Sequence, residues 1–193
     1  SLYTKAQTRK FEQSHKQDFS NLKNDEQKLL IELKENGYVI VPDFFDKSTC
    51  DACIDDMEWM FENKKEFLRK TDFGDFRIFG AEDLSENIKK FGNNNFLATL
   101  ANAYYGVAAC NGFTLAGKMI TTGHEYGSGG TWHRDSYNRQ FKSLIYLNDV
   151  TEKNGPFQIL ADSHKSEQIK IDKKIASLDE MQSSFPHQTI QKI

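Results

Sequence analysis

His133 and Asp135 are the residues of this sequence whose types and spacing could bind a metal ion. We expect the stretch 131–135 to be a β-strand, and side chains two positions apart on a strand share a face. One imidazole and one carboxylate on the same face can occupy adjacent corners of an octahedral metal, and a second histidine would complete a facial triad that leaves positions open for oxygen and a co-substrate. An exposed strand can also carry such a pair without any metal, so the pair alone leaves both interpretations open.

The other histidines and the cysteines give weaker signals. His15 and His124 lie in polar segments, where we expect ordinary surface roles. Cys50 and Cys53 have the spacing of a metal or redox motif, but no second cysteine pair occurs and both fall on the apolar side of an expected helix, which favours core packing. His164 follows a serine in a turn-like stretch, and we expect it to fix that turn by hydrogen bonding.

The elements that must position these residues form a helical first half and a β-rich second half. Leucines at helical spacing predict a helix over 24–36 that ends before Gly37. A second apolar stripe predicts a helix over 48–68, and a third helical region spans 84–105. Short apolar runs between turn residues predict strands at 38–41, 113–122, 131–135, 142–148 and 157–160.

Length, charge and cysteine content limit the function classes. The 193 residues suit one domain, and we expect a polar arm over 1–20 and a single domain over 21–193. A net charge of −3 lacks the basic footprint of a nucleic-acid binder. The chain has three cysteines, no signal-like leader and no run of the ~20 apolar residues that span a bilayer. We therefore expect a soluble, cytoplasmic protein without a membrane or nucleic-acid partner.

The segments after the candidate metal pair carry a more specific pattern. Trp132-His-Arg-Asp135 is followed by an expected strand, an acidic turn that ends in Asn154-Gly155, a second strand and Ser163-His-Lys165. This order resembles the phytanoyl-CoA dioxygenase family, in which a Trp-His-x-Asp motif precedes a strand, an Asn-Gly turn, another strand and a Pro-Gly-Ser-His-Lys segment. Residues 35–45, Glu-Asn-Gly-Tyr-Val-Ile-Val-Pro-Asp-Phe-Phe, also resemble the N-terminal entry to that fold.

The resemblance implies an α+β fold with a mainly β core. That core is a double-stranded β-helix, or cupin-like jelly roll, with N-terminal helices packed outside. The implied function is an Fe(II)- and 2-oxoglutarate-dependent dioxygenase that uses molecular oxygen to oxidise a C–H bond of a small-molecule or acyl substrate and releases succinate and CO2, with ascorbate as a candidate reductant. Asp135 favours hydroxylation, because relatives that halogenate lack this carboxylate. Lys118, Met119 and Thr121 are candidates for lining the 2-oxoglutarate pocket, although ordinary strand packing explains them equally well.

The sequence departs from the family pattern at two places. Ala161 and Asp162 replace the Pro-Gly of the family turn. The family's distal histidine, and the arginine after it that holds the far carboxylate of 2-oxoglutarate, are not evident. His187 is a candidate third ligand, but it follows Pro186, which disfavours a central strand, and no arginine occurs after it.

A jelly roll needs about eight strands, more than the sequence predicts. We therefore favour the explanation that the last strands, with the distal histidine and arginine, lie beyond these 193 residues. Two alternatives stay open: a non-catalytic jelly-roll binding module that lacks a third iron ligand, and a jelly-roll metalloenzyme independent of 2-oxoglutarate. The substrate and the oligomeric state are not indicated by the sequence.

Overall fold

Helix α2 begins the part of the chain that the computed structural model describes, which comprises residues 22–120, 132–179 and 183–191. It spans Asn24–Asn36, as predicted. Its first turn is closed by the backbone N–H of Lys23, which donates to Glu26 Oε2 at 2.9 Å. At the other end Gly37 adopts a φ of 84°, and its N–H donates to the Leu33 carbonyl at 2.9 Å. A left-handed glycine of this kind is a common helix terminator.

Helix α3 (Lys47–Asn63) supplies most of the helical side of the core. The Asp46 carboxylate caps it by accepting from the Thr49 N–H at 2.7 Å. Cys53 and Met60 are 2% and 0% exposed, which agrees with core packing for this cysteine rather than a metal or redox role. Burial also raises the pKa of the Cys53 thiol, so the thiol stays protonated and unreactive. The helix ends at Asn63, earlier than predicted, because the chain turns into the first strand.

An antiparallel sheet with the order β1-β2-β3 packs against α3. Its strands are β1 (Leu68–Lys70), β2 (Asp75–Phe79) and β3 (Leu115–Met119). Ile78 pairs with Ala116 and faces α3, and these two residues are 0% and 3% exposed. The neighbouring pair Phe79 and Leu115 faces the opposite way and is exposed. The predicted strand at 113–122 is therefore confirmed over 115–119, with one covered and one open face.

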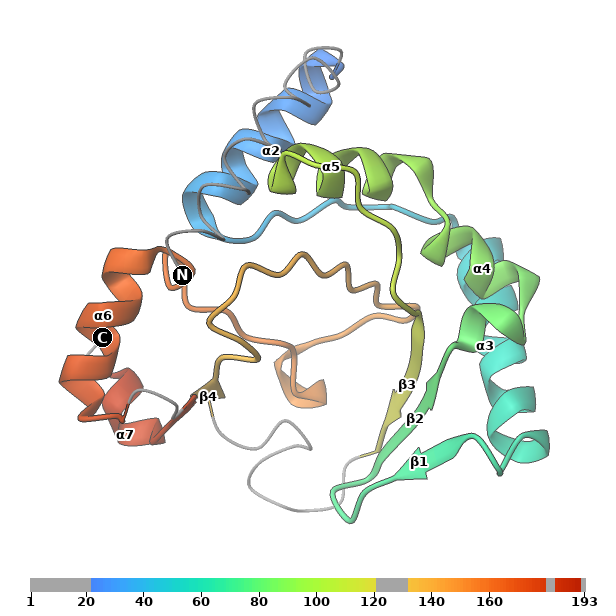
Figure 1. Cartoon of the computed structure of the whole chain (residues 1–193). Coiled ribbons are helices and arrows are strands. Elements are labelled where there is room, and N and C mark those ends of the chain that lie inside the picture. The colour runs from blue at the N-terminus through green and yellow to red at the C-terminus, as the bar shows by residue number, and fades with distance from the viewer. Residues whose placement is uncertain (1–21, 121–131, 180–182, 192–193) are drawn as a thin grey trace.

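Between β2 and β3 lie a 3-10 turn, η2 (Ala81–Asp83), and two helices, α4 (Glu86–Gly92) and α5 (Asn95–Tyr105). The single helical region predicted over 84–105 is thus divided, because the Asn94 side chain accepts from the N–H groups of Phe96 and Leu97 and starts a new helix. Figure 1 shows α3 and α4 beside the sheet, with α2 and α5 next to each other above it.

The second half contains little regular β-structure. It comprises β4 (Trp132–His133), η3 (Glu152–Asn154), α6 (Ser166–Ala176), β5 (Ser184–Phe185) and α7 (His187–Ile190). β4 and β5 form a two-stranded antiparallel sheet, and in Figure 1 the segment 134–165 runs from β4 towards the larger sheet and back. The described residues therefore form an α+β fold with two small sheets, without a closed jelly-roll barrel.

The strands predicted at 38–41, 142–148 and 157–160 were wrong, since none is paired in a backbone ladder. In or next to these stretches, two backbone N–H groups donate to tyrosine hydroxyls and not to the carbonyls of a neighbouring strand. The Phe157 N–H donates to Tyr146 Oη at 2.8 Å, and the Phe141 N–H donates to Tyr105 Oη at 2.7 Å. The alternating apolar side chains of these stretches are not all covered by other residues, since Leu144 is 65% exposed. No helix in the described ranges has the length and apolar character needed to cross a membrane.

Candidate metal-binding site

His133 and Asp135 lie side by side at the end of β4. His133 Nε2 is 3.2 Å from Asp135 Oδ1, and the two side chains are 41% and 51% exposed. The backbone leaves the strand after His133, and Asp135 lies in a bend that places its side chain beside the imidazole. The structure thus brings together the two residues that the sequence singled out, in contact with solvent.

Lys142 holds the carboxylate of this pair. Its ammonium group forms an ion pair with Asp135 Oδ2, on the opposite oxygen from the one that faces His133. The hydrogen bond from Lys142 lowers the pKa of Asp135 from its ordinary value, against the opposing effect of partial burial. Asp135 is therefore ionised at neutral pH, as a metal ligand must be.

The donor set fits a metal ion as two adjacent ligands. Two ligand atoms ~2.1 Å from a metal and at right angles to each other are ~3.0 Å apart. The 3.2 Å between His133 Nε2 and Asp135 Oδ1 is close to this value. An imidazole nitrogen with a carboxylate oxygen is also the donor combination of iron sites with a facial triad.

The third ligand is not assembled in the described part of the chain, where no cluster of three metal-binding side chains occurs. His187 is the first residue of α7 and is exposed. It follows closely after Ser184, which pairs with His133 across the β4–β5 sheet. The segment that carries His187 is therefore anchored next to the segment that carries the pair.

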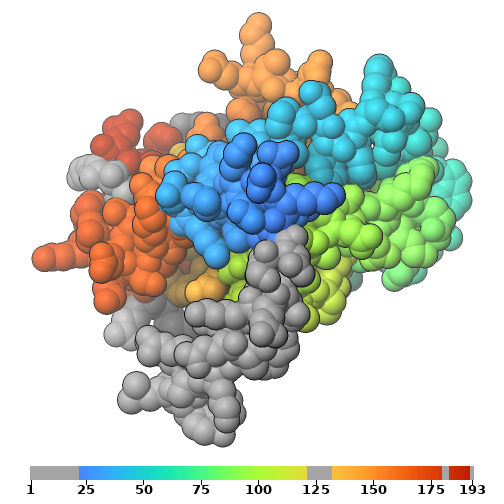
Figure 2. Space-filling view, turned by 90° about the horizontal axis from the view of Figure 1, so that it is seen from above, coloured from blue at the N-terminus to red at the C-terminus, as the bar shows by residue number. Residues whose placement is uncertain are grey.

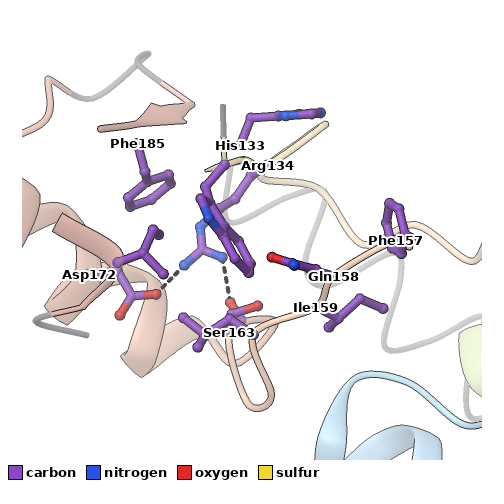
Figure 3. A pocket seen from close by; sticks show the side chains of 11 residues that line it. His133, Arg134, Phe157, Gln158, Ile159, Ser163, Asp172 and Phe185 are labelled. Carbon is purple, nitrogen blue, oxygen red and sulfur yellow. Dashed lines mark hydrogen bonds and ion pairs between the residues drawn. The ribbon is translucent and has the colours of Figure 1, made fainter. Parts of the chain in front are cut away.

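Arg134 lies between the two candidate ligands in the sequence and points away from them, with its side chain 12% exposed (Figure 3). Its Nη1 donates to the Ser163 carbonyl at 2.7 Å, and its Nη2 forms an ion pair with Asp172 of α6. Gln168 donates to the other oxygen of Asp172 at 2.6 Å. Sequence reasoning missed this pair: strand alternation places Arg134 opposite His133, but nothing in the polar stretch 166–176 marks Asp172 as fully buried.

A small pocket opens beside β4. It has a volume of about 130 Å³ and is walled by aromatic and aliphatic side chains, with Arg134 and Asp172 at its inner side (Figure 3). Phe157 and Ile159 contribute from the stretch predicted as a strand, and His133 lies at its edge. A space of this kind, with both apolar and charged walls, could admit a small group of a ligand beside His133.

The candidates for a 2-oxoglutarate pocket lie on or just after β3. Lys118 pairs with Phe76 on the covered face of the sheet, and its ammonium group forms an ion pair with Glu58 of α3 at 2.5 Å. Met119 faces the other way and is 66% exposed. Thr121 lies outside the described residues, as do His15 and His124.

The turn 162–164 caps the C-terminal end of α2. The Asp162 N–H donates to the Asn36 carbonyl at 3.0 Å, and His164 Nε2 is 3.0 Å from the Lys34 carbonyl. These carbonyls belong to the last turn of α2, where no intrahelical donor remains. In Figure 2, atoms of the second half of the chain (orange) lie against the N-terminal helix α2 (blue). The hydrogen-bonding role expected for His164 agrees with this position.

Asp162 occupies the position where the related turn has glycine. It adopts a φ of 63°, in the left-handed region that favours glycine. Aspartate tolerates this region better than most residues, and Lys165 forms an ion pair with its side chain at 2.5 Å. Asp162 therefore adopts at this turn a conformation that is usual for glycine.

Comparison with known proteins gives one match. The family model for phytanoyl-CoA dioxygenase (PhyH) matches residues 33–191, a range that includes the α2 end, β4, the 162–164 turn and α7. Searches of the curated proteins and of the solved structures found no significant match.

Proposed function

Because the chain belongs to the phytanoyl-CoA dioxygenase family, we propose that it is an Fe(II)- and 2-oxoglutarate-dependent dioxygenase that hydroxylates a C–H bond of a small-molecule or acyl substrate. The observation that carries the proposal is the adjacency of His133 Nε2 and Asp135 Oδ1, 3.2 Å apart on the matched segment. In the overall reaction one oxygen atom enters the substrate as a hydroxyl group, the other enters succinate, and CO2 leaves 2-oxoglutarate.

His133 and Asp135 hold the iron in this proposal. Bound iron and 2-oxoglutarate supply the oxidising chemistry, while the protein orients the ligands and the substrate. Lys142 keeps the pKa of Asp135 low, so the carboxylate is already ionised when the metal binds. The pocket of about 130 Å³ that His133 borders would hold part of the substrate near the site.

The remaining parts of the site belong to the same proposal. His187 is the candidate third ligand within the chain, and Lys118, Met119 and Thr121 are the candidates for 2-oxoglutarate binding. We also propose a jelly-roll fold that is completed by strands outside the described residues. Such strands would cover apolar side chains such as Leu144 and Phe157, which are 65% and 67% exposed. Residues 21–193 form one domain of a cytoplasmic protein in this proposal.

Succinate formation tests the function directly. We expect the purified protein, given Fe(II), ascorbate, oxygen and 2-oxoglutarate, to release succinate above the rate of a metal-free blank. His133→Ala and Asp135→Asn should each abolish this release, because each removes one of two ligands from a single metal. Asp25→Asn, at an exposed carboxylate in the first turn of α2, is the matched control and should leave the rate unchanged.

The outcomes separate the proposal from its two rivals. Metal binding that needs His133 and Asp135 but gives no succinate would refute the 2-oxoglutarate reaction and favour a metalloenzyme of another kind. Failure to bind metal at all would favour a non-catalytic binding module. Succinate release that persists in Asp135→Asn would show that iron is held elsewhere.

A further inference from the structure

Strand β4 is too short to hold its own position. Among the described residues its two positions pair with Ser184 and Phe185, and a two-stranded ribbon of this length has little stability by itself. His133 is the last residue of this strand and Asp135 follows two positions later, and both side chains are exposed. A metal site needs its ligands fixed to within about half an ångström. Something other than the β4–β5 pairing must therefore fix this strand.

Arg134 makes the contacts that can do so. Its guanidinium group reaches the Ser163 carbonyl and the Asp172 carboxylate at once, and it lies 5.2 Å from the centre of the Phe185 ring. Its backbone N–H donates to the Ser183 carbonyl at 2.9 Å. One side chain thus joins β4 to the 162–164 turn, to α6 and to β5.

The partner carboxylate makes this arrangement hard to displace. Asp172 is 0% exposed, and a buried charge is tolerated only when it is paired and hydrogen-bonded. The Ser163 turn is itself docked on α2 through His164 and Asp162. Through Arg134, the position of β4 is therefore set relative to α2 and α6, elements far from it in the sequence.

We propose that Arg134 is a positioning residue for the metal pair: with Asp172 and the Ser163 carbonyl it forms an arginine clamp that fixes β4, and through it His133 and Asp135. This inference rests on the proposed metal-binding function. Arginine is needed here because its planar fork satisfies two acceptors at fixed angles, whereas lysine is a single flexible point charge.

Metal affinity and thermal unfolding, measured together, test the clamp. Co(II) is titrated calorimetrically into the protein under anaerobic conditions, without substrate. Arg134→Lys keeps a positive charge near Asp172 but loses the fork, and we expect it to weaken Co(II) binding about 10–100-fold, as loss of a group that orients ligands usually does. Arg69→Lys, on β1, is the same substitution at an exposed arginine and should leave Co(II) binding unchanged.

A second variant separates positioning from folding. Arg134→Met with Asp172→Leu removes both buried charges, which is often neutral for stability. We expect its melting temperature to lie near that of the wild type, while Co(II) binding stays at least tenfold weaker because the Ser163 carbonyl has lost its donor. Wild-type Co(II) affinity in this folded variant would overturn the clamp. A wild-type protein that binds no Co(II) would instead overturn the proposed function, and the clamp with it.

Discussion

Replacing Gly37 by alanine should destabilise the protein through two separate effects. The residue has a φ of 84°, where a Cβ costs ~1–2 kcal/mol. The new Cβ would also lie 2.9 Å from Cγ of His164 and closer still to its Nδ1, whereas carbon atoms pack at ~3.5–4.0 Å. The imidazole must move, and its hydrogen bond to the Lys34 carbonyl, worth ~0.5–1.5 kcal/mol, is lost. We expect a combined loss of about 2–3 kcal/mol.

Thermal and urea unfolding followed by circular dichroism measure this loss. For a chain of this length, 2–3 kcal/mol corresponds to a fall in melting temperature of about 5–10 °C. Gly155→Ala is the matched control, because Gly155 has a similar φ of 68° but no neighbour within 4 Å of the added Cβ. It should therefore lose only the free energy that comes from the left-handed backbone conformation. In a His164→Ala background, the loss of unfolding free energy caused by Gly37→Ala should shrink to this backbone contribution alone. Equal penalties for Gly37→Ala with and without His164 would refute the contact.

Three further predictions follow from the core, a helix cap and the site. Met60→Ala should cost about 2–5 kcal/mol of unfolding free energy, because the side chain is 0% exposed, while Met119→Ala, at 66% exposure, should cost almost nothing in the same urea titration. Ser85→Ala removes the hydroxyl that caps α4 and should lower the unfolding free energy by about 1–2 kcal/mol, and an unchanged urea midpoint would contradict the cap. The folded pKa of Asp135 is lowered, so its ion pair stabilises the fold above the unfolded pKa and this contribution disappears as the pH falls through the folded pKa. Lys142→Met removes the first cause of that shift, and carbon-13 NMR of the carboxyl group should then show the Asp135 pKa closer to its ordinary value.

The features that could be predicted from the sequence depend on residues that lie close together in the chain. The bounds of α2 follow from leucines at helical spacing and from Gly37. The proximity of His133 and Asp135 was predicted from the period of a strand, although Asp135 lies in a bend after the strand. The left-handed conformation of Asp162 could not be read from its residue type.

The predictions that failed depend on distant partners. Alternating apolar residues at 142–148 and 157–160 indicate which way side chains prefer to point, but not whether a neighbouring strand exists, and here Tyr146 takes the place of one. The Arg134–Asp172 pair joins residues 38 positions apart, and Asp172 lies among lysines that suggest a solvated helix face. Burial of one polar residue in a polar helix is decided by tertiary packing.

The capping of α2 by the 162–164 turn has a consequence for the order in which the chain acquires structure. Lys34 and His164 are 130 positions apart, so the contact has a high contact order and closes a very long loop. At ~5–20 residues per second, a ribosome completes α2 roughly 6–25 seconds before the turn exists. Until then the last carbonyls of α2 are exposed to water, and the nascent helix frays at this end. Docking of the turn would complete α2 and position Ser163 for Arg134 in one late step, coupling the first part of the chain to the candidate metal site.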